Sequence, residues 1–178
     1  VRYYLDAHPR DKIVNLDLLT YAGNPENLAD IEDSTRYSFL KGDIANKFDV
    51  EKAIGRGVSA IINFAAETHV DRSISDAKPF LHTNVMGVHN LLEAARFYHV
   101  DRYIQISTDE VYGSSKDEPF SEESPLRTNS PYAATKAAGD LLVRAYVTTY
   151  NLAAIITRAA NNYGPYQYPE KVLPLFVT

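Results

Sequence analysis

The stretch SAIINFAA, residues 59–66, is a mainly apolar run without a regular alternation of polar residues. Strict alternation is typical of a strand with one face in water, whereas a continuous apolar run is typical of a strand buried on both faces. Strands of the second kind occur in parallel sheets that helices cover. This stretch therefore predicts an α/β fold.

Other apolar segments are also predicted to be strands, and helical patterns separate them. Further strands are predicted at 12–17, 102–107 and 153–158. Another strand is predicted within 37–44, and it ends near Gly42. The helices are predicted at 24–31, 46–56, 78–99 and 131–150. This alternation implies right-handed crossovers between parallel strands. We expect a Rossmann-like, doubly wound parallel sheet with helices on both faces, forming one domain over residues 1–178.

Composition limits the classes of function. The 178 residues carry a formal net charge of −5, and Lys and Arg are scattered, so nucleic acid is not expected as a partner. No apolar run reaches the roughly 20 residues that span a bilayer, and no signal peptide is recognisable, so we expect a cytoplasmic protein without a membrane partner. With no cysteine and no metal-like spacing of its five histidines, no metal site is expected.

Polar and charged residues gather where the predicted strands end. In parallel α/β sheets, ligands bind beyond the carboxyl ends of the strands. Candidate site residues lie at each of these ends: Asp17, Asp43, 65–68, 107–110 and 158–162.

YAATK, residues 132–136, places Tyr132 and Lys136 one turn apart on a predicted helix, so both side chains share a face. A nearby ammonium stabilises a phenolate and so lowers the pKa of a phenol, which is near 10 when unperturbed. The pair therefore predicts a general base. Tyr and Lys also occur at this spacing by chance.

STDEVY, residues 107–112, follows the predicted strand at 102–107 directly. Ser, Thr and Asp at a strand end are ordinary turn or helix-cap residues. A hydroxyl followed by two carboxylates is also a set of groups suited to proton transfer. The stretch alone does not separate these interpretations.

Five motifs in order resemble one family: LDLLTYAGN, FAAETHVDRS, STDEVYG, SPYAATKAAGD and TRAANNYGPYQYPEK. They resemble the extended branch of the short-chain dehydrogenase/reductases, within it the NAD-dependent sugar-nucleotide epimerases and dehydratases. Members open with a strand and a glycine-rich loop and end with a substrate lobe. The resemblance implies that this chain is a fragment that begins inside the first helix, with the substrate-binding region starting near 161–178.

The resemblance also implies an NAD site. Asp17 would bind the adenosine ribose, which favours NAD over NADP. The implied cofactor-binding residues are Asp17, Leu18, Leu19, Thr20, Asp43, Ile44, Phe64, Ala65, Ala66, Thr68, Thr83, Ser107, Tyr132, Lys136 and Asn162. In ETHVDRS, His69 and Arg72 are expected to be loop residues without a catalytic role.

The implied reaction is dehydration of a nucleotide sugar through transient oxidation. The catalytic residues would be Thr108, Asp109, Glu110, Tyr132 and Lys136. Substrate would contact Thr68, Thr108, Asp109, Glu110, Asn161 and Lys171. Adjacent carboxyl groups in a closed pocket favour a single shared proton, which suits an acid and a base that act together.

Several alternatives stay open. One alternative is a 4-epimerase, although the related 4-epimerases typically carry small residues where Asp109 and Glu110 stand. Another is a non-catalytic NAD-binding relative, which would not need all five catalytic residues. The choice between thymidine and uridine nucleotides is also open. A homodimer is expected, because the predicted helices at 78–99 and 131–150 are apolar on more than one side, at Phe97, Tyr98, Val100, Val143, Tyr146, Val147 and Tyr150.

Overall fold

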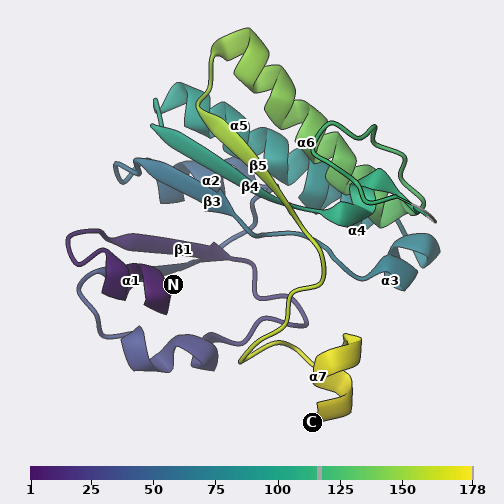
Figure 1. Ribbon diagram of the computed structural model, residues 1–178. Helices are drawn as coiled ribbons and strands as arrows, with labels where there is room; N and C mark the ends of the chain where they lie inside the picture. Colours follow the sequence, from purple (N-terminus) through teal and green to yellow (C-terminus); the bar gives the residue numbers. More distant parts are fainter. Residues whose placement is uncertain (116–117, 178) are drawn as a thin grey trace. The chain divides into compact units, whose positions relative to one another are not determined.

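The computed structural model describes residues 1–115 and 118–177, so Lys116, Asp117 and Thr178 of the expected domain lie outside the described residues (Figure 1). The described chain forms two compact units, one from residues 1–42 with 161–178 and the other from residues 43–160. The elements are α1 (Arg2–Ala7), β1 (Ile13–Asp17), η1 (Pro25–Ile31), β2 (Tyr37–Lys41), α2 (Lys47–Ile54), β3 (Ala60–Asn63), α3 (Val70–Ser75), α4 (Lys78–Leu81), η2 (His82–Gly87), α5 (Val88–Phe97), β4 (Arg102–Thr108), η3 (Asp109–Tyr112), α6 (Pro131–Tyr150), β5 (Ala154–Ala159) and α7 (Val172–Val177).

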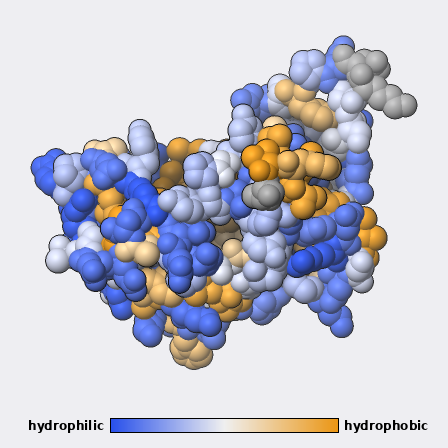
Figure 2. Space-filling model, turned by 90° about the horizontal axis from the view of Figure 1, so that it is seen from below, coloured by the Kyte–Doolittle hydropathy of each residue, from blue (hydrophilic) through white to orange (hydrophobic). Residues whose placement is uncertain are grey.

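The first unit contains a two-stranded parallel sheet. β1 pairs with β2 from Ile13 opposite Tyr37 to Asp17 opposite Lys41. Its C-terminal segment carries α7, whose side chains are all apolar and mostly exposed (Figure 2). The Tyr21 hydroxyl donates to Glu170 Oε2 at 2.8 Å and so connects the two stretches of chain that form this unit.

The second unit contains a three-stranded parallel sheet in the order β3-β4-β5. One face packs against α6, and α5 runs beside α6 on the same side (Figure 1). The core of this unit includes Phe80, Leu92 and Tyr103, whose side chains are almost fully buried. On the alternate positions of the sheet, Ile62 and Ile155 are exposed.

The sequence of α6 explains why this helix forms where it does. The Ser130 hydroxyl accepts a hydrogen bond from the Ala133 N–H at 3.1 Å, and Pro131 occupies the first helical position. The helix ends at Asn151, which adopts the left-handed conformation with φ 54°. The bounds agree with the predicted helix at 131–150.

The parallel pairing and the alternation of strands with helices are confirmed. Several local expectations are wrong. The predicted helix start, with Asn24 as the N-cap and Pro25 in the first helical position, is confirmed, but the segment is a 3-10 helix with a kink at Leu28. β3 is half as long as the predicted strand because the chain turns after Asn63. The expected loop in ETHVDRS contains α3, so Arg72 lies on a helix. No helix among the described residues is long and apolar enough to cross a membrane.

Candidate active site

Tyr132 and Lys136 lie in the first turns of α6, and both side chains are buried. The Tyr132 ring packs edge-on against Phe80, with ring centroids 6.4 Å apart. The Tyr132 backbone N–H donates to the Ser73 hydroxyl of α3 at 3.1 Å. Packing and a backbone hydrogen bond therefore both fix the position of the phenol.

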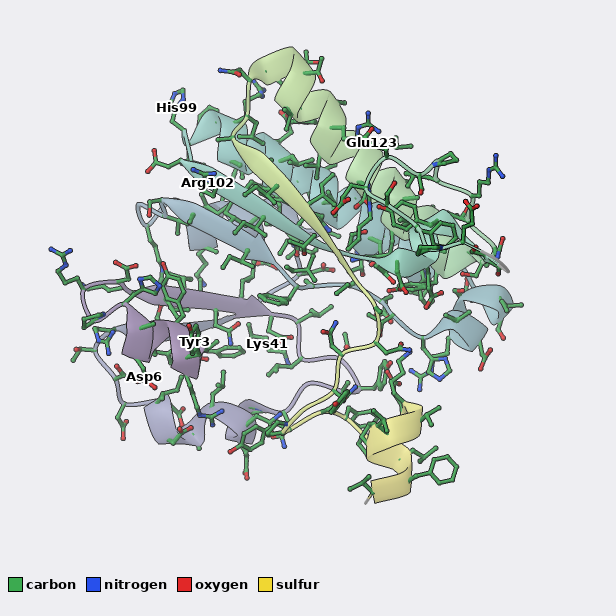
Figure 3. The ribbon with its side chains drawn as sticks, viewed as in Figure 1. Tyr3, Asp6, Lys41, His99, Arg102 and Glu123 are labelled. Carbon is green, nitrogen blue, oxygen red and sulfur yellow. The ribbon has the colours of Figure 1, made fainter. Side chains whose placement is uncertain are left out.

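The carboxyl end of β4 presents a buried hydroxyl beside exposed carboxylates. Thr108 is the N-cap of η3: its Oγ1 accepts from the Glu110 N–H at 3.3 Å and donates to Asp109 Oδ1 at 3.2 Å. Ser107 and Thr108 are buried, whereas Asp109 and Glu110 are exposed. Thr108 therefore does cap a helix, and the same cap places both carboxylates at the strand end. His99 and Arg102 lie at the amino end of β4, away from these residues (Figure 3).

The environment of Tyr132 raises the pKa of its phenol. Burial is the main cause, and the negative charges of Glu110 and Asp109 also raise the pKa, while a hydrogen bond with Thr108 lowers it. The structure thus brings Thr108, Asp109, Glu110 and Tyr132 together. The expected lowering of this pKa by Lys136 is not found in the described chain: burial outweighs the hydrogen bond with Thr108, and the Lys136 ammonium hydrogen-bonds to the Ile106 carbonyl instead.

Lys136 makes its hydrogen bond to the sheet. Its ammonium Nζ donates to the Ile106 carbonyl oxygen at 2.6 Å. Burial lowers the pKa of Lys136, and the charge of Asp140 opposes that effect. The side chain therefore lies between α6 and β4, one turn beyond the phenol.

Asn84 fixes the turn that follows β3. Its Oδ1 accepts from the Glu67 N–H at 3.0 Å, and its Nδ2 donates to the Glu67 carbonyl at 3.0 Å and to Thr135 Oγ1 at 3.1 Å. The predicted site residues Phe64, Ala65, Ala66 and Thr68 lie in this turn, and the Ala65 N–H donates to Asn63 Oδ1 at 3.1 Å. Thr83 adjoins Asn84 in η2.

Asp43 and Ile44 lie at the start of the second unit. Asp43 Oδ1 accepts from the Ala45 N–H at 2.8 Å, and Oδ2 pairs with His82 Nε2 at 3.1 Å. Ile44 is buried, and its carbonyl accepts from Asn90 Nδ2 at 3.1 Å. His82 and Asn90 both come from the helical stretch after residue 78, so this stretch contacts both residues.

The remaining predicted residues belong to the first unit. Asp17 ends β1, and its Oδ1 accepts from the Leu19 N–H at 2.8 Å in a tight turn in which Leu19 has φ 54°. Leu18 and Thr20 belong to the same turn. Asn161, Asn162 and Lys171 lie in the C-terminal segment of this unit, where the Asn162 carbonyl accepts from Gln167 Nε2 at 3.3 Å.

Sequence reasoning missed the residues that support this site. Ser73 and Asn84 contact the backbone of site residues, and Asp140 acts on Lys136. Asn84 was predicted only as part of the helix at 78–99, and no role was predicted for Ser73. The one available signal was Asp140, four residues after Lys136 on the same helix. Among the described residues, no group of acidic and histidine side chains could hold a metal ion.

Comparison with known proteins gives consistent matches. The sequence matches the family described as GDP-mannose 4,6 dehydratase over residues 1–178. It is 53% identical over 167 residues to dTDP-glucose 4,6-dehydratase of Streptomyces niveus, covering 94% of this chain and 49% of that protein. It is 50% identical over 177 residues to the low-salt glycan biosynthesis protein Agl12 of Haloferax volcanii, covering 99% of this chain and 56% of that protein.

A solved structure matches equally well. The double mutant of DesIV, a dTDP-glucose 4,6-dehydratase from Streptomyces venezuelae, was solved with NAD and DAU bound. It superposes with a TM-score of 0.94 at 49% sequence identity and is matched over 99% of this chain and 55% of that one. The chain therefore spans about half the length of the relatives it matches.

Proposed function

Since this chain belongs to the GDP-mannose 4,6 dehydratase family, we propose that the whole protein containing it is an NAD-dependent dTDP-glucose 4,6-dehydratase. The observation that carries the proposal is the carboxylate pair, Asp109 and Glu110, which the Thr108 cap places close enough to Tyr132 for both charges to act on its phenol. Simple hydride transfer needs a hydroxyl, a phenol and an ammonium. Dehydration needs two carboxyl groups in addition.

The residues present fit NAD. The carboxylate of Asp17 is exposed at the carboxyl end of β1, where an acidic side chain accepts hydrogen bonds from ribose hydroxyls and repels a 2′-phosphate. The other residues of the proposed cofactor site are Leu18, Leu19, Thr20, Asp43, Ile44, Phe64, Ala65, Ala66, Thr68, Thr83, Ser107, Tyr132, Lys136 and Asn162. Bound NAD would supply the acceptor for a hydride from C4 and return that hydride to C6.

Tyr132 acts first in the proposed mechanism. The phenolate takes the proton of the 4-hydroxyl while Thr108 donates a hydrogen bond to the same oxygen. Because burial raises the pKa of Tyr132, the phenolate needs compensating positive charge. We assign this role, in the whole protein with NAD bound, to Lys136, one turn further along α6. The resulting 4-ketone makes the C5 proton acidic.

The carboxylates then complete the elimination. Glu110 removes the C5 proton and Asp109 protonates the departing C6 hydroxyl, so that one water leaves. Asp109 and Glu110 are both exposed in this chain. We propose that they share a single proton in the whole protein, where the site is closed around the substrate. We propose that the sugar nucleotide contacts Thr68, Asn161 and Lys171. The substrate-binding region would begin near 161–178, and the remaining residues would form the NAD-binding domain.

The test is conversion of dTDP-glucose by the whole protein. We expect a 4-keto-6-deoxy sugar nucleotide, detected by its alkali-induced absorbance, with no net consumption of NAD. A 4-epimerised sugar without loss of water would identify a 4-epimerase instead. Parallel assays with UDP-glucose decide between thymidine and uridine nucleotides. Binding of NAD without any turnover would indicate a non-catalytic relative.

The proposal extends to the cell. We propose that the product is a precursor of rhamnose-type cell-surface polymers. We also propose that the enzyme is cytoplasmic, which fits its use of a nucleotide sugar. A homodimer is proposed through α5 and α6. Phe97 and Tyr150 are 70% and 51% exposed there. Val100, Val143 and Tyr146, which the sequence suggested for this contact, are buried in the core.

A further inference from the structure

An ion pair between a buried aspartate and a partly buried arginine lies one helical turn beyond Lys136 and has no part in the proposed chemistry. Arg158 Nε of β5 donates to Asp140 Oδ2 of α6 at 2.9 Å, and Asp140 is fully buried, with 0% of its surface exposed. Arg158 Nη1 also donates to the Tyr112 hydroxyl at 2.8 Å, and its guanidinium lies 5.1 Å from the centre of that ring. The arginine therefore connects α6 and β5 to η3.

Asp140 continues the row of site residues on α6. Tyr132, Lys136 and Asp140 are spaced four residues apart, and all three side chains are buried, so they share one face of the helix. Asp140 Oδ1 and the Ser107 hydroxyl are both buried, and neither has a hydrogen bond of ordinary geometry among the described residues. The hydroxyl is nevertheless near enough to lower the pKa of Asp140. One oxygen of the carboxylate thus faces Arg158, and the other points to no strong donor.

Burial raises the pKa of Asp140, while the contacts with Arg158, Ser107 and Lys136 lower it. We take the pair as ionised, because a guanidinium keeps its proton in proteins and a partly buried guanidinium opposite a neutral acid would lack a counter-charge. The charge of Asp140 is therefore available to Lys136.

We propose that Asp140 is a positioning residue of this site, an inference that rests on the proposed function: its carboxylate keeps Lys136 in the ammonium form one turn from Tyr132. Arg158 supports it by compensating the buried carboxylate and by fixing η3 through Tyr112. The titratable groups that face this region are Tyr132 and Asp140 on α6, Arg158 on β5, and Asp109, Glu110 and Tyr112 on η3. Of these, Asp140 is the one whose charge raises the pKa of Lys136 against the effect of burial.

The sign of the effect follows from this arrangement. Removing the Asp140 charge lowers the pKa of Lys136, so the ammonium loses its proton at a lower pH. The active pair, phenolate with ammonium, is then lost earlier on the alkaline side. At acidic pH Lys136 is charged in both proteins, so the rate there stays the same.

Asp140→Asn in the whole protein tests the proposal, with Asp140→Glu as the conservative variant and exposed Asp101→Asn as the matched control. The first readout is independent of activity: an NMR titration of ¹³Cε-labelled lysine, with the Lys136 signal assigned from Lys136→Arg. We expect a lower Lys136 pKa in Asp140→Asn, and wild-type behaviour in Asp101→Asn. An unchanged Lys136 pKa overturns the proposal.

The second readout is the pH profile of the reduction of bound NAD by dTDP-glucose in a single turnover. In Asp140→Asn the alkaline limb moves to lower pH, and the rate on that limb falls by about threefold to tenfold. Asp140→Glu restores the limb. An equal loss at every pH would show a merely structural role and overturn the proposal.

If Asp140→Asn does not fold, the double variant Asp140→Asn/Arg158→Gln takes its place. It removes both charges and so leaves no buried ion unpaired. The same shift of Lys136 is expected in this double variant, and its absence counts against the proposal. If wild type and Asp101→Asn do not reduce bound NAD, the proposed function fails. The titration of Lys136 still decides the role of Asp140.

Discussion

Tyr132 shows how opposing effects meet at one side chain. Burial raises the pKa of its phenol, the nearby carboxylates raise it further, and the hydrogen bond with Thr108 lowers it. A base in this position therefore depends on each group that stabilises its anion. In the proposed mechanism, Lys136 and bound NAD would supply the positive charge that offsets burial of the phenol.

Thr108→Val should weaken the base by removing the hydrogen bond that lowers the pKa of Tyr132. With that pKa higher, phenolate forms only at higher pH, so the acid limb of the oxidation rate moves to higher pH. The rate at neutral pH should fall by about tenfold, as expected for one lost hydrogen bond to a charged group. Thr108→Ser keeps the hydroxyl and is the control. An acid limb at the wild-type pH in Thr108→Val would contradict the assigned role of the hydroxyl.

The carboxylates should separate the two halves of the reaction. Asp109→Asn with Glu110→Gln preserves shape but removes both proton carriers, and general acid–base catalysis is worth about 10² to 10⁴ for each group. We expect net turnover to fall at least about a hundredfold, while oxidation at C4 continues. A single-turnover absorbance trace should show reduced nicotinamide accumulating without product.

Tyr132→Phe is the comparison for that experiment, because it should prevent any reduced nicotinamide from forming. Product formation at the wild-type rate in the double variant would mean that Asp109 and Glu110 serve only as the first turn of η3. The two variants together therefore separate the step that needs the phenol from the step that needs the carboxylate pair.

At the scale of elements, sequence reasoning succeeded where local chemistry determines the structure. The cap at Ser130, the proline after it and Asn151 at the other end set the bounds of α6. It failed where tertiary contacts decide. α3 is a short helix whose Ser73 contacts the start of α6, and the predicted helix at 78–99 contains the π-helical segment η2 next to α6.

The same distinction holds for the candidate site. The hydroxyl, the carboxylates, the phenol and the ammonium stand in two local motifs, and the family resemblance implied their roles. Thr108, Asp109, Glu110 and Tyr132 lie together in the structure. The raised pKa of Tyr132 and the contact of Arg158 with Asp140 were not predictable. Both depend on burial and on residues that are distant in sequence, which no local pattern encodes.

The turn after η3 offers a stability test at this scale. Gly113 has φ 84° and ψ −144°, and a Cβ there would lie 2.0 Å from the Arg127 carbonyl oxygen. Gly113→Ala should lower the free energy of unfolding by more than about 2 kcal/mol, since both the backbone conformation and the clash are unfavourable. Urea unfolding measures the loss.

Gly57→Ala is the matched control for that variant. Gly57 also has φ 84°, but a Cβ there would meet nothing within 4 Å, so only the conformational strain remains. We expect a loss of about 1 kcal/mol. Equal losses for the two variants would show that the contact with Arg127 is not a constraint on this turn.

At the scale of the whole molecule, large apolar side chains on the outer surfaces of α5 and α6 need an explanation. Phe97, Tyr98, Val147 and Tyr150 are all exposed, although the helices that carry them have well-packed inner faces. The Arg96 guanidinium lies 5.0 Å from the Tyr150 ring centre, which places the ends of the two helices together. Clusters of this kind on soluble proteins commonly mark a protein interface.

Phe97→Asp with Tyr150→Asp should therefore convert the proposed homodimer into monomers. Charges at the centre of an apolar helix-to-helix contact would lose their hydration without gaining partners. Because each protomer of a two-fold dimer contributes the same surface, every contact would contain the substitutions of both protomers. Light scattering at micromolar concentration measures the mass. Phe48→Asp, at an aromatic residue that is 79% exposed on α2, is the matched control and should leave the dimer intact. A wild-type protein of monomer mass would contradict the proposed dimer, and a double variant that stays dimeric would place the contact on another surface.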